Sequence, residues 1–409
     1  MTQGSDSSSP PSSASNSAAT GNTTPQLDLS ASLTTGSSLG NDGVLRPFVN
    51  ERLNSRLAES LPSGAMKIRW QKDLSVGVNP IFLLQSGDRI LAQGTDLWQL
   101  FDVTGKSIHV DELARSSVVL DPTNALFYLA RPDGTIAGRK LTDGTPAFIL
   151  PVLFGPQFER NFLARVGQRF LVVSIEQPIS PHSDKQPNLS LIEVQDFGNP
   201  PVTDDLGFLT SAQRTASQDY KTTLFKAALH GERITFATPE NLYISDLSLK
   251  ARSILHEKFE PIAISLDEEG SIYLLVEAEG RKALWRVSLQ GGRQMTFLMP
   301  RDMQVSAIPP IIGRNHRAYI LGTNRVLAID PDGKLAWVRP LKSAQAAAVI
   351  TNNDQLLVAD GSDLAAFDAA GERRTLHSFA GELLATPPVI TKRGEILVAS
   401  QRRLYSLMP

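Results

Sequence analysis

The 409-residue chain contains no cysteine. This absence excludes disulfides, thiolate metal ligands and cysteine nucleophiles. The chain also lacks an excess of either charge, since its formal net charge is −2 and its pI is near 6.3. Broad nucleic-acid binding needs a basic surface, so we expect no nucleic-acid partner. No apolar run reaches the roughly 18 residues that a membrane-spanning helix needs, and we expect no such span.

Local motifs for catalysis or metal binding are missing as well. The six histidines are too widely separated to form a local metal-binding pair. Nucleophile-elbow, phosphate-loop and zinc-protease motifs do not occur. The stretch "DPDG" (330–333) resembles the opening of a calcium loop, but the later acidic ligands are absent, which favours a plain β-turn. We therefore predict no catalytic residue, no metal and no cofactor.

The N-terminal stretch "MTQGSDSSSPPSS" has no basic segment followed by an apolar one, so it does not resemble a secretory signal. As written, the sequence predicts a cytoplasmic protein, with the periplasm or cell envelope as the alternative. Residues 1–40 contain 12 Ser and 6 Thr but only two charges. Such a composition buries too little surface to offset chain entropy, and it predicts a disordered tail over residues 1–43.

A short apolar pattern follows in "LRPFVNERLNSRLAESL" (45–61). Its apolar residues recur near helical spacing, and Pro47 suits a first helical turn. The pattern predicts a short amphipathic helix over residues 44–62. Two interpretations remain open: the helix packs on its own domain, or it docks into a partner's groove.

Residues 67–409 repeat one unit of apolar strands separated by turns that carry Gly, Asn or Asp. The clearest copies are "NPIFLLQSGDRILAQGTDLWQLFDVTGKSIHV" (79–110) and the stretches 308–341, 346–376 and 386–409. The first turns of eight copies are anchored by Gly87, Asn124, Gly167, Gly231, Gly270, Asn315, Asp354 and Gly394. Eight units give about 43 residues each, which is the length of a four-stranded blade. We predict an all-β, eight-bladed β-propeller, with seven blades as the alternative if the weak copy at 161–204 is not a full sheet.

Two defects in the repeat indicate how the ring closes. The last copy stops at "LYSLMP", after its third strand. The fragment "MKIRWQKDL" (66–74) precedes the first copy and resembles a fourth strand that lacks the first three strands of a unit. Trp70 and Leu74 of this fragment match Trp337 and Leu341 of a complete copy. We predict that the N-terminal strand is the missing fourth strand of the last blade, which leaves no sheet edge open.

The stretch "AIDPDGKLAWVRPL" resembles the repeat of quinoprotein-like (PQQ-repeat) β-propellers, with Asp332 where that family usually has Thr. Trp70 and Trp337 match the repeat's docking tryptophan. In size and blade number the chain is similar to the non-catalytic BamB-type propellers. The quinone-dependent dehydrogenases of the same group are typically larger and carry an adjacent cysteine pair, which cannot exist here. The resemblance implies a scaffold and transfers no catalytic residue to this chain.

Departures from the period indicate where a partner would bind. Two insertions lie in the third unit, at 175–188 between its second and third strands and at 204–222, which we place after its fourth strand. Both connections would then emerge on the same face, and loops on a rigid scaffold commonly carry binding function. Neutral surface decoration remains the alternative. On this face the sequence places seven cations, which are Arg131, Lys185, Arg281, Lys282, Arg325, Arg402 and Arg403.

A ring of cations at one mouth of the propeller could attract an acidic peptide or ligand, although Lys and Arg are also common at exposed hairpin tips. We predict a non-enzymatic scaffold for protein–protein interaction, a monomeric unit of a larger assembly that binds its partner on the loop-rich face. The alternative is a quinone- or small-molecule-binding propeller, an enzyme or a sensor, that uses the central channel.

Overall fold

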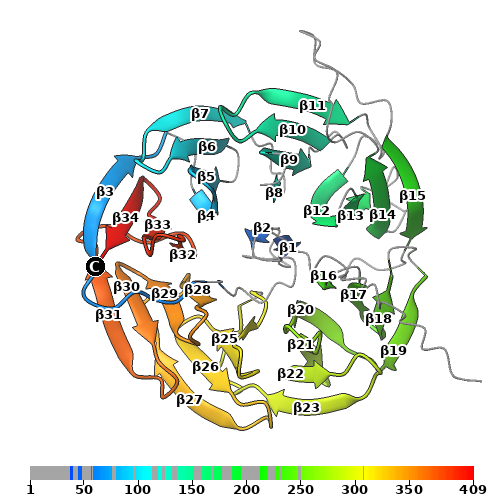
Figure 1. The fold of residues 1–409 in the computed structure, drawn as a ribbon. Coiled ribbons are helices and arrows are strands. Elements are labelled where there is room, and N and C mark those ends of the chain that lie inside the picture. Colours follow the sequence, from blue (N-terminus) through cyan, green and yellow to red (C-terminus); the bar gives the residue numbers. More distant parts are fainter. Residues whose placement is uncertain are drawn as a thin grey trace, which may run out of the picture.

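The computed structural model describes residues 57, 59–75, 83–94, 97–112, 118–121, 125–129, 136–149, 226–230, 233–246, 250–306 and 308–409. It describes the backbone alone of residues 37–39, 45–47, 80–82, 130, 150, 158–166, 169–176, 187–194 and 212–219. Every regular element within these ranges is a β-strand. The described strands form eight four-stranded antiparallel sheets and one two-stranded sheet. The four-stranded sheets stand as blades around a common centre, which confirms the predicted all-β propeller (Figure 1).

We number the blades along the chain. Blade 1 comprises β4 (Pro80–Ser86), β5 (Arg89–Gly94), β6 (Leu97–Asp102) and β7 (Ser107–Glu112), and blade 2 comprises β8 (Val118–Asp121), β9 (Leu126–Ala130), β10 (Ile136–Lys140) and β11 (Pro146–Leu150). Blade 3 comprises β12 (Phe158–Val166), β13 (Arg169–Glu176), β14 (Pro187–Val194) and β15 (Ala212–Asp219), and blade 4 comprises β16 (Lys226–His230), β17 (Arg233–Thr238), β18 (Asn241–Ser245) and β19 (Arg252–His256).

Blade 5 comprises β20 (Glu260–Leu266), β21 (Ile272–Ala278), β22 (Arg281–Val287) and β23 (Arg293–Leu298), and blade 6 comprises β24 (Ile311–Ile312), β25 (Ala318–Leu321), β26 (Arg325–Ile329) and β27 (Leu335–Pro340). Blade 7 comprises β28 (Ala347–Ile350), β29 (Leu356–Asp360), β30 (Asp363–Phe367) and β31 (Arg373–Ser378). Blade 8 comprises β32 (Val389–Ile390), β33 (Ile396–Ala399), β34 (Arg403–Met408) and β3 (Lys67–Asp73), while β1 (Ser37–Leu39) pairs with β2 (Leu45–Pro47).

The middle strands of a blade are buried on both faces because each blade lies between two others. Strand β29 is buried along its whole length, and β30 is too. Such strands contain continuous apolar runs of Val, Leu, Ala and Phe, as strands covered on both sides do. Outer strands such as β27 are less buried, and Trp337 is the one buried residue of that strand. The core is therefore a ring of inter-blade layers.

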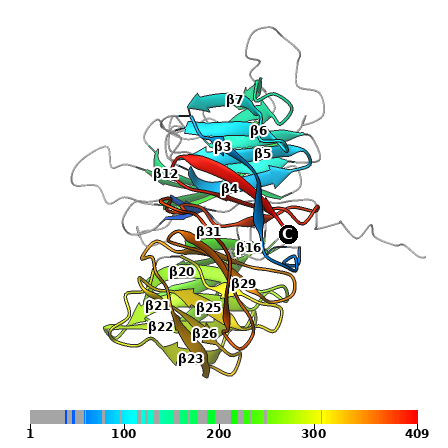
Figure 2. The same cartoon turned by 90° about the vertical axis from the view of Figure 1, so that its left-hand side faces the viewer.

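The predicted closure of the ring is confirmed. Strand β3 pairs antiparallel with β34 from Lys67 opposite Met408 to Asp73 opposite Arg403. The Leu74 N–H donates a further hydrogen bond of 2.8 Å to the carbonyl of Arg402. The C-terminus consequently lies beside the first strand of the propeller (Figures 1 and 2).

The matching tryptophans have a common structural role. Trp337 in β27 packs against Gly371 in the third turn of the next blade, and its Nε1–H donates to the carbonyl of Ala369 at 3.1 Å. Trp70 in β3 packs in the same way against Gly105 of blade 1. Both glycines have positive φ, 79° and 80°, and a Cβ on either would lie within 3 Å of the indole ring. The "D-x-x-G" turn thus supplies both the bend and the space for the side chain of the preceding blade.

Of the segment predicted as a helix, residues 44, 48–56 and 58 lie outside the described residues, and the described remainder is not helical. Residues 45–47 form strand β2, and residue 57 and residues 59–62 lie in irregular structure. The backbone hydrogen bonds go to blade 7 instead, because the Leu57 N–H donates to Ile350 and the Glu59 carbonyl accepts from Asn352. Leu57 and Leu61 are buried among core residues of blades 7 and 8. These two leucines therefore serve packing on the protein's own domain.

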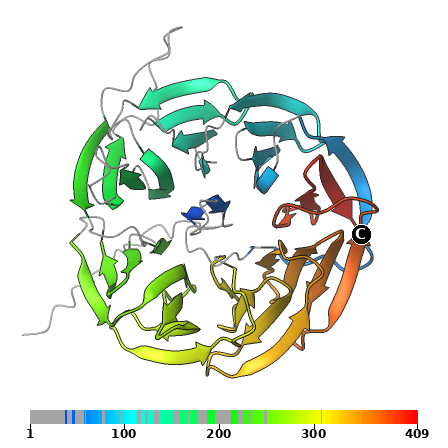
Figure 3. The same ribbon diagram turned by 180° about the vertical axis from the view of Figure 1, so that it is seen from behind.

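The two-stranded sheet lies near the centre of the ring in both face views (Figures 1 and 3). Its strands contact inner strands of three blades, β4, β12 and β16. The remainder of the tail predicted to be disordered, residues 1–36 and 40–43, lies outside the described residues.

One boundary in the third unit was predicted wrongly. Strand β15 (Ala212–Asp219) is the fourth strand of blade 3 and lies within 204–222, the segment that we placed after that strand. The long connection is therefore 195–211, between the third and fourth strands. Both 177–186 and 195–211 lie outside the described residues. Because β14 pairs antiparallel with β13 and with β15, the strand ends that these two segments join are at opposite ends of the blade, which contradicts the prediction of one shared face.

Candidate functional site

We call the rim that carries the second-to-third-strand turns and the blade-to-blade crossovers the loop face. The opposite rim, which carries the other two turns of each blade, is the turn face. Five predicted cations lie on the loop face or at its edge, at Arg281, Lys282, Arg325, Arg402 and Arg403. Arg131 and Lys185 lie outside the described residues.

Neighbouring carboxylates accompany two of these cations. Arg325 lies 2.6 Å from Asp302, which comes from the preceding crossover. Arg403 contacts Asp73 at 3.0 Å and Glu382 at 3.1 Å. The described part of the loop face therefore carries charges of both signs, and the proposed role of the cations in binding a partner stays a prediction.

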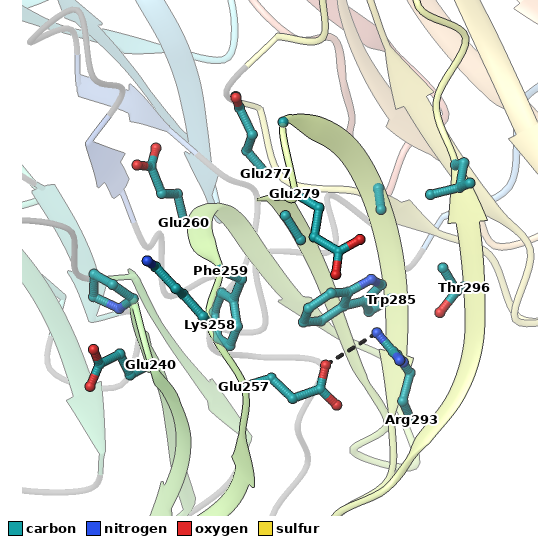
Figure 4. A pocket seen from close by; sticks show the side chains of 15 residues that line it. Glu240, Glu257, Lys258, Phe259, Glu260, Glu277, Glu279, Trp285, Arg293 and Thr296 are labelled. Atoms are coloured by element: carbon teal, nitrogen blue, oxygen red, sulfur yellow. Dashed lines mark ion pairs between the residues drawn. The ribbon is translucent and has the colours of Figure 1, made fainter.

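A groove of about 990 Å³ lies between blades 4 and 5 on the loop face (Figure 4). Its walls come from the second turn of blade 4, the crossover into blade 5, the second turn of blade 5, and strands β22 and β23. Five glutamates line it, which are Glu240, Glu257, Glu260, Glu277 and Glu279. Lys258 and Arg293 are its two cations.

The floor of the groove is apolar and ordered by aromatic contacts. Phe259 and Trp285 meet edge to face, with ring centroids 5.2 Å apart, and both belong to the core between the two blades. The guanidinium of Arg293 lies 4.8 Å from the centroid of the Trp285 ring and forms an ion pair of 3.2 Å with Glu257. Leu298 at the rim is 48% exposed. The groove thus combines a fixed aromatic floor with a polar rim.

The backbone fixes the positions of the residues that carry the rim carboxylates. Crossover hydrogen bonds from Glu257 N–H to the Glu240 carbonyl and from Phe259 N–H to the Pro239 carbonyl fix the blade 4 side. Glu260 and Glu277 are directly paired residues on adjacent strands β20 and β21. Glu279 begins the tight turn into β22 with φ of 52°, a conformation that favours Asn or Gly.

A second polar cluster on the loop face is structural. Asp363 is buried and accepts hydrogen bonds from Lys342 at 2.6 Å, Arg373 at 2.9 Å and Ser378 at 2.8 Å. Burial alone would raise the pKa of Asp363, but these three donors outweigh it and lower the pKa to about 2. Neighbouring Asp360 accepts from the backbone N–H of Lys342 and of Ser343. Together these carboxylates hold the crossover from blade 6 onto blade 7.

Among the described residues, no cluster of three or more His, Asp or Glu side chains could hold a metal ion. The described part of the chain also contains no helix of sufficient length and apolarity to cross a membrane.

Comparison with known proteins agrees with the geometry. Residues 268–405 match the family model described as "Outer membrane protein assembly factor BamB". This match begins in blade 5 and runs into the last strand of blade 8. The chain is a PQQ-like β-propeller. No curated protein sequence matches it significantly.

Solved structures support the PQQ-like propeller at the level of the fold. The crystal structure of BamB from Moraxella catarrhalis aligns with a TM-score of 0.55 and 10% identity, over 85% of this chain and 98% of that one. The structure of the Dos1 propeller aligns with a TM-score of 0.58 and 10% identity, over 84% of this chain and 95% of that one. At such low identity these likenesses establish the fold alone.

The acidic groove was missed at the sequence level. Its carboxylates lie in "TPENLY", "HEKFEP" and "LVEAEG", which are the second turn of one unit, the following crossover and the second turn of the next unit. The same periodicity that placed the cations on the loop face would have placed these glutamates beside one another. The signal is therefore the recurrence of glutamate at loop-face positions of two neighbouring units.

Proposed function

We propose that this PQQ-like β-propeller is a non-enzymatic scaffold that binds a protein partner through its loop face within a larger assembly. The groove between blades 4 and 5 is the observation that carries the proposal. It is fixed on both sides by sheets and has a polar rim, and its base is formed by the buried Phe259 and Trp285 with the exposed Leu298 beside them. Apolar centres surrounded by polar rims are the usual composition of protein interfaces.

Two further observations support a binding role. The family model matched by residues 268–405 is described as an outer membrane protein assembly factor, which suggests that this chain also takes part in an assembly. Strands β1 and β2 of the chain itself lie near the centre of the ring, in the region that a channel-bound small molecule would occupy (Figure 1). The loop face is therefore the better candidate surface.

Affinity capture from the source organism tests this function with variants of the two faces. Leu383 lies in the crossover from blade 7 to blade 8, on the loop face outside the groove, and its side chain is 70% exposed. We expect a discrete partner to co-purify with the full chain and with a turn-face variant, but to be lost with a loop-face variant such as Leu383→Asp. A near-stoichiometric bound quinone, or a large thermal shift on adding pyrroloquinoline quinone with Ca²⁺, would instead support the small-molecule role.

A further inference from the structure

We propose that the groove between blades 4 and 5 binds an extended segment of the partner protein that carries lysines or arginines around an apolar residue. The inference rests on the proposed scaffold function and names the chemistry of its partner. The basic residues would lie along the glutamate rim, which Figure 4 shows around Trp285. The apolar residue would contact Leu298, the exposed apolar side chain of the groove, above the buried Trp285.

Charge complementarity is the first argument. Five glutamates against Lys258 and Arg293 leave the groove with three net negative charges, whereas the whole chain carries a net charge of −2. The net negative charge of the groove lining therefore exceeds that of the whole chain. A concave, partly apolar site with charge of one sign attracts a ligand of the opposite sign.

The rim also keeps carboxylates in positions that do not favour folding. Glu260 is the register partner of Glu277 across β20 and β21, and Lys282 of β22 is the partner of Glu277 on its other side. Lys282 can balance the charge of Glu277, whereas the pairing of two glutamates does not favour folding. The backbone of Glu279 is left-handed, and this conformation is energetically unfavourable for a residue that has a side chain. Cations of a bound segment would offset the repulsion between the first two residues and would find the third presented at the tip of a turn.

The spread of the carboxylates favours a chain over a small ion. They come from three separate connections, and among the described residues no three acidic or histidine side chains converge closely enough for a metal. A segment with several spaced cations can reach all three connections at once. Arg293, stacked 4.8 Å from the Trp285 centroid, is a cation already bound by this site within the chain itself.

A peptide-binding assay with the full-length chain tests the proposal. The probe is a fluorescently labelled peptide of lysine and arginine interspersed with leucine and serine, followed by anisotropy. Its two counterparts replace the cations by glutamate or the leucines by serine. We expect the basic, leucine-containing peptide to bind with an affinity that falls as salt rises, the serine version to bind more weakly, and the acidic version not to bind.

Neutralising the rim should weaken this binding. The double variant Glu260→Gln/Glu277→Gln removes two carboxylates, and we expect about a tenfold loss of affinity, from two partly exposed ion pairs. The matched control Glu269→Gln/Glu372→Gln makes the same charge change on the turn face, where these side chains are 70% and 79% exposed, and should bind as the unmodified chain does. Because the rim variant also removes a like-charge pair, its Tm should be unchanged or raised, which separates loss of binding from loss of folding.

Three outcomes would overturn the groove assignment. They are failure of the basic peptide to bind, equal loss of affinity in the rim and control variants, and equal binding of the acidic peptide. Retention of the cellular partner by the rim variant would also refute it while leaving the scaffold function in place. Absence of any partner on the loop face would refute the scaffold function itself.

Discussion

The contact between Trp337 and Gly371 gives the sharpest test of how the blades hold together. In the variant Gly371→Ala, the new Cβ would lie 2.7 Å from Cδ2 of Trp337 at a backbone φ of 79°. The left-handed conformation costs an alanine about 1–2 kcal/mol. Displacing a packed indole adds about 1–3 kcal/mol. We therefore expect the free energy of unfolding to fall by about 2–5 kcal/mol.

A second glycine provides the control for backbone strain. Gly381 has a φ of 73°, and a Cβ there would meet no atom within 4 Å. Gly381→Ala should therefore lose only the backbone contribution of about 1–2 kcal/mol. Urea unfolding monitored by tryptophan fluorescence and by circular dichroism measures both variants. If Gly371→Ala is no less stable than Gly381→Ala, packing of the indole on the glycine turn does not join these blades.

Two further predictions concern closure and acid stability. A chain that begins at residue 57 keeps the buried Leu57, Leu61 and Met66, and one that begins at 67 should be less stable because these side chains are lost. A chain that begins at 75 should lose cooperative thermal unfolding because β3 is gone. Equal stability of the last two chains would contradict closure by β3. Because the pKa of Asp363 is lowered to about 2 from an unfolded value of 3.8, its contribution of about 2 kcal/mol is present above pH ~4 and lost as the pH falls toward 2. The urea midpoint of the unmodified chain should fall as the pH is lowered across this range. If the midpoint of Asp363→Asn falls by a similar amount, groups other than Asp363 cause the acid destabilisation.

The repeat made the propeller and its closure predictable from the sequence. Strand patterns recur at a nearly constant period, and the unpaired fragment "KIRWQKDL" matches the strand missing from the last unit. Both signals are local residue patterns, and a strand can be predicted from such a pattern without knowledge of its tertiary contacts. Burial of the middle strands between neighbouring blades then follows from closure of the ring.

The errors arose where tertiary contacts decide the local structure. Leu57 and Leu61 have helical spacing, yet these described residues are irregular, and Leu57 and Glu59 hydrogen-bond to the end of β28 and the turn after it. Strand β15 reads "AQRTASQD", and its polar composition was mistaken for a loop, because an outer strand needs little apolar surface. The pairing of Arg325 with Asp302 joins residues from different connections, so the position of the cation alone could not reveal its partner.

Site-specific photo-crosslinking in cells of the source organism tests the scaffold account most directly. Crosslinkers would replace Glu279 and Leu383 on the loop face, and Glu269 and Glu372 on the turn face. The account predicts that the same discrete protein is crosslinked from the loop-face positions and not from the turn-face positions. Crosslinks to that protein from the turn face alone, or none from the loop face, would contradict it.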